Sequence, residues 1–230
     1  MFGARKVHGY GAAGDAYWDD VKLLLMMDGT NGSTTFTDSS DNAKTVTAQN
    51  TAQLTTTDPK YGTACGDFTT SWDHVSIVST DNDFQTGDVD FCVDMWAKPD
   101  SGPTGIDRTV FERCANGAGI NLCVGLGGIR FRGNSTIDLD YVTTLVAGTW
   151  VHVAFQYVAA TDTKEIYLNG TRVANAVTNI NTSGVCAVEI GSPTFLSSTF
   201  RFTGHLDAVR YTNAHRFPSS GFTPAEPIIG

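Results

Sequence analysis

Short runs of apolar and β-branched residues recur along the chain, and residues typical of turns separate them. Runs of this kind, bounded by Gly, Pro, Asn and Asp, predict β-strands. No apolar stripe with the helical period is longer than about two turns, apart from a single turn near Asp81–Gln85. We therefore expect many strands and few helices. The expected strands are Val21–Met27, Thr45–Ala48, Cys65–Phe68, Val75–Val78, Val89–Ala97, Thr109–Arg113, Ile120–Val124, Ile129–Arg132, Ile137–Val142, Trp150–Tyr157, Lys164–Asn169, Thr171–Ala174, Cys186–Ile190 and Phe200–Arg210.

The pattern is strongest between residues 148 and 210. Residues 150–157 are apolar on both faces, as expected for a strand at the centre of a two-layer β core. Asn169-Gly170 supplies the two positive-φ residues of a type I′ turn, and β-forming residues flank it. Residues 202–207 alternate between apolar or small side chains and polar ones. These segments predict a central strand, a hairpin and a second long strand.

A chain of 230 residues with so many short strands fits one all-β domain. We predict a jelly-roll sandwich of two antiparallel sheets. The domain is expected over residues 18–224, after an extended N-terminal arm (1–17) and before a C-terminal tail (225–230). Pro218, Pro224 and Pro227 exclude a central strand after Phe217, so this end should run over the surface.

Several phrases, in their order along the chain, resemble the laminin-G-like branch of the concanavalin A-like lectin/glucanase superfamily. They are residues 23–40, 61–68, 84–96, the Trp150-Val151-His152-Val153 strand, the Asn169-Gly170 hairpin and the phrase from Gly204 to Arg210. Residues 15–18, 27–32 and 216–224 look like laminin-G-like proteins encoded by tailed bacteriophages, in which a short Gly-rich leader precedes one lectin-like domain. The resemblance covers about residues 18–224. It implies a concanavalin A-like fold and a virion surface protein, either a capsid decoration or a tail appendage.

Composition and charge argue against several classes of function. The net charge of -9 and the sequence pI near 4.8 argue against a nucleic-acid partner. No segment approaches the length of a transmembrane helix, so membrane insertion is not expected. The first residues hold no apolar signal-peptide core, and we expect no secretory signal. A lectin-like domain made without such a signal fits a virion surface protein that is assembled in the host cytoplasm.

The five cysteines, Cys65, Cys92, Cys114, Cys123 and Cys186, form an odd set without a CxxC pair. Cys92 and Cys123 lie in apolar runs, where cysteine behaves as a small buried hydrophobe. We expect free thiols in the core, with one or more disulfides as the alternative.

Residues 1–17 are rich in Gly and Ala and offer little apolar periodicity. We predict that Arg5, Lys6, His8 and Tyr10 anchor this arm to other virion proteins, and that the chain is a homo-oligomer on the particle. A disordered leader, or an arm ordered by the domain itself, is the alternative.

Because the superfamily includes glucanases, a catalytic site has to be considered. A retaining glycosidase needs two carboxyl groups about 5 Å apart. The nearest match on one strand is Asp90 and Asp94, which share a face but lie about 13 Å apart along the strand. The chain also has no GxSxG or HExxH motif and no local pairing of Cys with His. We predict no catalytic residues.

A structural Ca²⁺ is the one cofactor that the sequence suggests. Ca²⁺ takes about six to eight oxygen ligands, and many related jelly rolls hold one. The resemblance aligns Asp207 with an acidic position that helps to hold the ion in relatives, and Asp28 is the expected partner. The phrase Leu206-Asp207-Ala208 lacks the second acid that relatives carry, which weakens the site. For each Asp the alternative is a turn residue that binds backbone amides.

Lectins of this fold stack exposed aromatic side chains on sugar rings and bind the hydroxyls with polar neighbours. Trp72 lies in a polar turn beside Asp73, which predicts a stacking platform; a subunit contact and local packing are the alternatives. Arg130 and Arg132 alternate on one strand and predict a basic, exposed stripe, for which solvation is the alternative. These four residues are the predicted carbohydrate-binding site.

The sequence therefore favours a non-enzymatic virion accessory protein that uses a lectin-like domain for weak adhesion to glycans or the host surface. A purely structural cement or interface protein that binds no sugar is the alternative. A glycan hydrolase is a lesser alternative.

Overall fold

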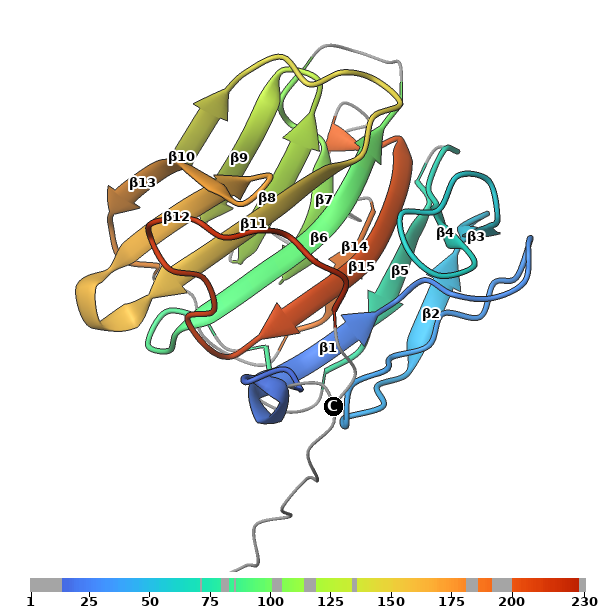
Figure 1. Ribbon diagram of the computed structural model, residues 1–230, viewed down its shortest axis with the longest axis horizontal. Helices are drawn as coiled ribbons and strands as arrows, with labels where there is room; N and C mark the ends of the chain where they lie inside the picture. Colours follow the sequence, from blue (N-terminus) through green and yellow to red (C-terminus); the bar gives the residue numbers. More distant parts are fainter. Residues whose placement is uncertain are drawn as a thin grey trace, which may run out of the picture.

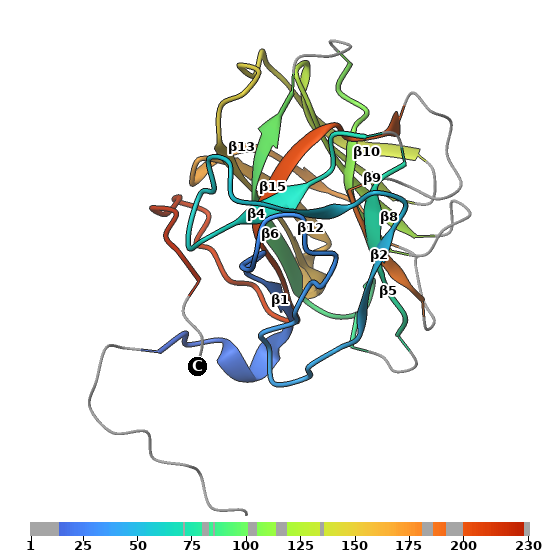
Figure 2. The ribbon, with the colours of Figure 1, turned by 90° about the vertical axis from the view of Figure 1, so that its right-hand side faces the viewer.

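The computed structural model is a sandwich of two antiparallel β-sheets (Figures 1 and 2). It describes residues 14–70, 72–79, 83–84, 86–100, 105–113, 119–133, 136–180, 186–191 and 200–227. Two short 3-10 helices are present in these ranges, η1 (Trp18–Asp20) before the first strand and η2 (Ala159–Thr161) after β11. No helix in the described ranges is long and apolar enough to cross a membrane.

The first sheet has eight strands, in the hydrogen-bonded order β13-β12-β11-β6-β15-β4-β3, with β1 paired to β15 beside this path. Its long central strands β6, β11 and β15 are apolar on the inner face and carry polar or charged residues on the outer face. The strand bounds are β1 (Val21–Leu25), β3 (Gln53–Thr55), β4 (Cys65–Asp67), β6 (Phe91–Pro99), β11 (Val151–Val158), β12 (Thr163–Leu168), β13 (Thr171–Val177) and β15 (Gly204–Thr212).

The second sheet has seven strands, in the order β10-β9-β8-β7-β14-β5-β2. Because successive side chains on a strand point to opposite faces, its core residues alternate with an outward row that includes Glu112, Asn121 and Arg132. The strand bounds are β2 (Val46–Gln49), β5 (His74–Ile77), β7 (Thr109–Arg113), β8 (Ile120–Gly125), β9 (Gly128–Gly133), β10 (Thr136–Val142) and β14 (Val188–Ile190).

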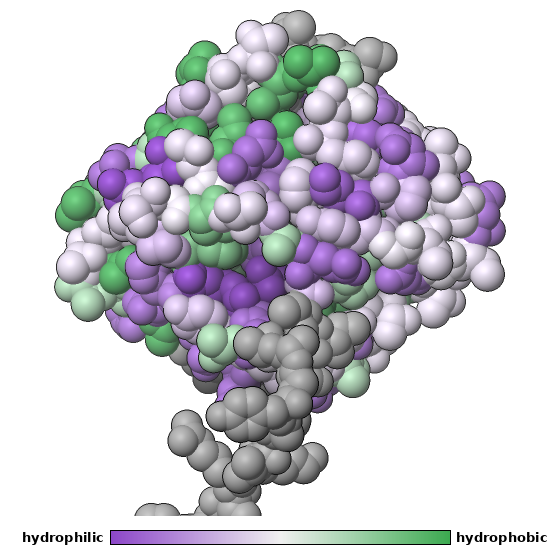
Figure 3. Space-filling view, viewed as in Figure 1, coloured by the Kyte–Doolittle hydropathy of each residue, from purple (hydrophilic) through white to green (hydrophobic). Residues whose placement is uncertain are grey.

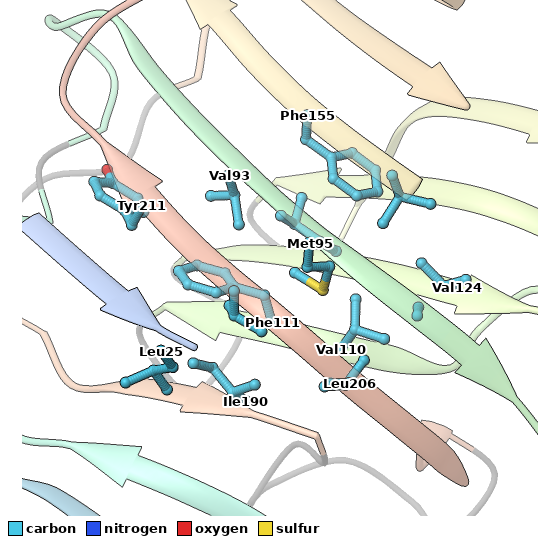
Figure 4. Packing of buried hydrophobic residues seen from close by; sticks show 14 of the residues in the cluster. Leu25, Val93, Met95, Val110, Phe111, Val124, Phe155, Ile190, Leu206 and Tyr211 are labelled. Atoms are coloured by element: carbon cyan, nitrogen blue, oxygen red, sulfur yellow. The ribbon is translucent and has the colours of Figure 1, made fainter. Parts of the chain in front are cut away.

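One continuous apolar core fills the space between the sheets (Figure 4). Tyr211 of the first sheet stacks on Phe111 of the second, with ring centroids 5.9 Å apart and an interplanar angle of 15°. Met95 and Leu206 from the first sheet lie beside Val110 from the second (Figure 4). Side chains of the two inner faces therefore interdigitate, which is how aligned sandwiches build their core.

The predicted fold class is confirmed, and each expected strand overlaps an observed one. The turn at Asn169-Gly170 has φ values of 49° and 80°, as a type I′ turn requires. β3 was not predicted, because it lies in a Thr-rich polar stretch in which Leu54 is the one large apolar residue. The turn expected near Asp81–Gln85 lies largely outside the described residues.

The chain after β15 crosses the outer face of the first sheet without forming a strand, as its prolines predict (Figure 1). Phe217 and Phe222 of this segment stack on each other with ring centroids 3.7 Å apart, and both rings contact Tyr167 of β12. We call residues 213–227 the tail from here on, a longer segment than the C-terminal tail (225–230) expected from the sequence. Its two aromatic rings cover polar residues that would otherwise face solvent.

The thiol prediction is confirmed for three cysteines, since Cys65, Cys92 and Cys123 are free and buried. It is wrong for Cys186, which is disulfide-bonded. Cys186 lies next to β14 between Val185 and Ala187, so its apolar neighbours in the sequence did not distinguish it from the buried free thiols. Cys114 lies outside the described residues.

Candidate functional site

The outer face of the seven-stranded sheet is polar but well covered. Arg130 and Arg132 on β9 are only 12% and 16% exposed, so the predicted exposed basic stripe is wrong. Arg130 pairs with Asp107 and Asp140 at 2.6 Å each, and Arg132 pairs with Asp107 at 2.7 Å. These hydrogen bonds to the carboxylates raise the pKa of Arg130 further above its usual value, against the effect of burial. The two arginines therefore form a neutralised ion-pair cluster.

Trp72 lies in the turn between β4 and β5, and its position is unusual. Its φ of 71° is left-handed, a conformation that bulky residues rarely adopt. Two hydrogen bonds hold it there, because the Trp72 carbonyl accepts from Asn50 Nδ2 at 2.6 Å and from His74 Nδ1 at 2.8 Å. The residue is 38% exposed. Backbone strain of this kind is often found at functional sites.

The segment at residues 200–201 links Trp72 with the arginine cluster. The guanidinium of Arg201 lies 4.6 Å from the centre of the Trp72 ring. Its neighbour Phe200 has the guanidinium of Arg132 at 5.2 Å from its own ring. Two predicted binding residues, Trp72 in its turn and Arg132 on β9, are thus joined through consecutive arginine–aromatic contacts. We call Trp72, Phe200, Arg201 and Arg132 the arginine–aromatic row.

Asp73 does not join this row. It is 2% exposed, and its Oδ1 accepts from the Thr51 amide at 2.9 Å and the Thr51 hydroxyl at 2.8 Å. Its Oδ2 accepts from the Thr70 amide at 3.0 Å. The carboxylate therefore holds the two turns beneath Trp72 together, a role that is common for Asp side chains in turns.

A pair of carboxylates that sequence reasoning missed lies on the same outer face. Glu112 on β7 and Glu189 on β14 are direct cross-strand partners. Side chains opposed in this way have Cβ atoms about 5 Å apart. Glu112 is 4% exposed, and its Oε1 accepts from Asn121 Nδ2 at 2.7 Å. A search for two acids on one strand cannot find such a pair, because the pairing of β7 with β14 creates it.

The two predicted metal ligands both bind one loop, residues 60–63. The Oδ2 atom of Asp207 accepts from the amides of Lys60 at 2.9 Å and Tyr61 at 3.1 Å. The Oδ1 atom of Asp28 accepts from the Thr63 amide at 2.5 Å and the Thr63 hydroxyl at 3.0 Å. Each aspartate therefore has one oxygen occupied by this loop.

The described residues do not fit a Ca²⁺ site. No group of three or more His, Cys, Asp or Glu side chains suited to hold a metal occurs among them. Asp28 and Asp207 supply at most four of the six or so oxygens that Ca²⁺ requires, so backbone carbonyls or water would have to supply the others. Burial raises the pKa of Asp207 to about 7, although the amides of Tyr61 and Lys60 act to lower it. Backbone amides of this loop thus bind one oxygen of each aspartate, and the Ca²⁺ site stays a prediction.

The outer face of the eight-stranded sheet carries a buried ion-pair network. Arg210 on β15 forms a two-pronged contact with Asp94 on β6, with both N–O distances 2.9 Å. Its third nitrogen lies 3.1 Å from Asp15, which also pairs with Arg216 at 2.7 Å. Burial acts to raise the pKa of Asp94, but the charge of Arg210 and hydrogen bonds from His152 and Arg210 hold it well below its usual range. Asp94 therefore stays ionised inside the network.

Residues 15–17 belong to this network although the sequence assigned them to the arm. The amide of Tyr17 donates to Asp15 Oδ1 at 2.9 Å, and the guanidinium of Arg216 lies 5.1 Å from the Tyr17 ring. The predicted anchoring residues Arg5, Lys6, His8 and Tyr10 lie outside the described residues.

A pocket of about 200 Å³ opens between the network and the tail. Its walls combine charged groups with aromatic and proline side chains. Sequence reasoning missed it because its members are spread from residue 15 to residue 227, and no local phrase contains more than a few of them. The members are Asp15, His152, Arg210, Arg216, Phe217, Phe222 and residues 223–227.

Solved structures with this fold include saccharide-binding domains. The receptor-binding domain of botulinum neurotoxin D matches with a TM-score of 0.64 and 14% identity, over 87% of this chain and 50% of that chain. Domain 4 of AbnA, a GH43 extracellular arabinanase from Geobacillus stearothermophilus, in complex with arabinotriose, matches with a TM-score of 0.62 and 15% identity, over 87% and 96%. The botulinum neurotoxin serotype D ligand-binding domain in complex with N-acetylneuraminic acid matches with a TM-score of 0.63 and 15% identity, over 87% and 49%.

At these identities the likeness shows the fold alone, and the chain spans about half the length of the toxin domains it matches. No curated protein matches the chain in sequence. A family model does match residues 69–219, which is well over half of the chain and runs from the Trp72 turn to the tail. The chain therefore belongs to the concanavalin A-like lectin/glucanases superfamily.

Proposed function

We propose that this chain is a non-enzymatic surface protein of a tailed-phage virion, either a capsid decoration or a tail appendage. Its lectin-like domain provides weak adhesion to glycans or to the host surface. Weak monovalent binding suffices on a particle, because many copies multiply the avidity.

The observation that carries the adhesion proposal is the exposed Trp72 ring in its strained turn. One face of the ring is engaged by Arg201, which leaves a half-exposed aromatic surface of the kind that stacks on sugars. Two solved domains of the same fold, one in complex with arabinotriose and one with N-acetylneuraminic acid, support a saccharide ligand by analogy.

The virion part of the proposal rests on the resemblance of the opening and closing phrases to phage-encoded relatives. We propose that residues 1–17 bind other virion proteins, and that copies of the chain assemble on the particle. Deleting residues 1–13 tests the arm without removing Asp15 or Tyr17 from the domain. We expect the shortened chain to fold but not to bind particles that lack the protein; undiminished binding would contradict the anchor.

Glycan binding is tested on an array and on host cells with the purified chain. We expect Trp72→Ala to abolish binding, and Val78→Ala, at a position that is 75% exposed, to leave it unchanged. Thermal unfolding of both variants controls for loss of fold. If the wild-type chain binds no glycan and no cell, the structural cement protein becomes the better proposal.

The opposed Glu112 and Glu189 are the one observation that favours a hydrolase as a second candidate. Their separation of about 5 Å at Cβ is compatible with a retaining pair. Incubation of bound glycans followed by mass spectrometry tests this. Product formation that disappears in both Glu112→Gln and Glu189→Gln would replace adhesion by catalysis, whereas unchanged glycans would support adhesion.

A further inference from the structure

The pocket beneath the tail lies on the outer face of the eight-stranded sheet, the face shown in Figure 1, whereas Trp72 lies in the turn that joins the two sheets. Figure 3 shows this face from the same side, with mainly hydrophilic residues and scattered apolar ones. Two strands contribute to the pocket floor, β11 through His152 and β15 through Arg210. The tail forms the remaining wall through Phe217, Phe222 and the residues that follow.

Two buried polar atoms in this pocket have no hydrogen-bond partner among the described residues. They are Nδ1 of His152, a residue that is 3% exposed, and Nε of Arg216, whose side chain is 8% exposed. The other polar atoms of these side chains are engaged, with His152 Nε2 3.4 Å from Asp94 and an Arg216 nitrogen 2.7 Å from Asp15. Buried polar atoms nearly always have a partner. A ligand or a water molecule in the pocket would supply the missing partners.

The charges of the pocket favour a neutral ligand. Arg210 and Arg216 bring two positive charges to the walls, and Asp15 and Glu226 bring two negative charges. Because the charges balance, an anion would gain little attraction from the pocket as a whole. A hydroxyl group suits the two open atoms better, since it donates and accepts hydrogen bonds at once.

The remaining wall is aromatic and the space is small. Phe217 and Phe222 are stacked at an interplanar angle of 7°, and the edge of the His152 ring meets Phe222 at a centroid distance of 5.5 Å. A flat aromatic wall beside hydroxyl-binding groups matches a sugar ring, which has an apolar C–H face and polar edges. Drug-sized ligands occupy pockets of about 300 to 1,000 Å³. A pocket of about 200 Å³ therefore holds a single ring.

We propose that this pocket binds one neutral monosaccharide unit, with its hydroxyls on Arg216 Nε and His152 Nδ1 and its apolar face against Phe222. This inference rests on the proposed saccharide-binding function and adds a second site, independent of Trp72. A chain with two such separate sites is able to contact two branches of a glycan or two neighbouring glycans.

The test uses the full chain with free glucose, galactose, mannose and N-acetylglucosamine, and with glucuronate as an anionic probe. Saturation-transfer NMR detects binding, and titration calorimetry gives the affinity. We expect a dissociation constant on the order of millimolar for at least one neutral sugar, with no tighter binding of glucuronate.

Two variants locate the site. Arg216→Lys keeps a positive charge near Asp15 but removes the Nε donor, and Phe222→Ala removes the stacking surface. Each should weaken monosaccharide binding by about tenfold or more, whereas Val78→Ala, at an exposed position that does not line the pocket, should leave it unchanged. If Arg216→Lys does not fold, Phe222→Leu keeps the apolar volume without the flat ring and serves in its place.

The outcomes separate this inference from the proposed function. Array binding that depends on Trp72 and ignores Phe222 and Arg216 would overturn the pocket and keep the adhesion proposal, with water as the pocket's occupant. Absence of all glycan and monosaccharide binding would overturn both. Monosaccharide binding that both pocket variants weaken would confirm the site even if Trp72 proves inert.

Discussion

Replacing Asp94 by Asn should strongly destabilise the fold, because it leaves Arg210 buried without its main partner. The two side chains are 3% and 8% exposed and meet through two contacts of 2.9 Å. Breaking a buried ion pair by removing one partner costs about 3 to 5 kcal/mol. Asp15, at 3.1 Å from Arg210, remains as a second partner, so we expect the lower end of this range, about 3 kcal/mol.

Urea unfolding, followed by tryptophan fluorescence at pH 7, measures this loss. Asp19→Asn is the matched control, because Asp19 is exposed and its carboxylate has no hydrogen bond or ion pair among the described contacts. We expect the control to change the free energy of unfolding by less than about 0.5 kcal/mol. A loss in Asp94→Asn no larger than the control would refute the view that this pair stabilises the fold.

The same network predicts how the loss depends on pH. The pKa of Asp94 is lower in the folded chain than in the unfolded one, where it is about 3.9. The stability contributed by its charge is therefore fully present above that unfolded value and is lost as the pH falls toward the folded value. The difference between wild type and Asp94→Asn should thus shrink when the comparison moves from pH 7 to about pH 3. An equal difference at both pH values would contradict the ionised state of Asp94.

Two further predictions concern the tail and the metal. Gly170 has a φ of 80°, and a Cβ there would meet the Phe222 carbonyl, whereas a Cβ at Gly148, with a φ of 72°, would meet nothing within 4 Å. In both Gly→Ala variants the free energy of unfolding should fall by about 1 to 2 kcal/mol, because alanine is strained in the left-handed backbone conformation. Gly170→Ala should lose more than Gly148→Ala and should expose the tail to protease, because its Cβ meets the Phe222 carbonyl. Equal losses in the two variants would mean that the tail is not held at Gly170. Calcium should leave the melting temperature within about 1 °C of the value in chelator, because a bound structural ion at a hundred times its dissociation constant would add about 2.7 kcal/mol of stability.

The sequence predicts the local features of this fold but few of the contacts between strands that are distant in the sequence. The pattern of apolar and polar residues predicted the strands, and Asn169-Gly170 predicted a hairpin, because both features depend only on residues that are neighbours in the sequence. The prediction of an exposed basic stripe was wrong for Arg130, because Asp107 and Asp140 pair with its guanidinium. Strand register and the placement of a loop bring these two carboxylates beside it, and neither can be seen in the sequence near Arg130. Trp72 was found because an aromatic residue in a polar turn is conspicuous in the sequence itself.

Both sheets of this sandwich bury charged residues on their outer faces, and this arrangement bears on where ligands bind. Covered charges destabilise a fold unless each is paired, and Arg210 and Arg130 each meet two carboxylates. Buried atoms without a partner also occur elsewhere among the described residues, at Arg132 Nε and Asp207 Oδ1, so it is a position beside a pocket that makes such an atom informative. His152 Nδ1 and Arg216 Nε, two such atoms, line one pocket, and an aromatic wall stands beside them. Saccharide hydroxyls would complete this set of contacts without disturbing the ion pairs that hold the tail to the sheet.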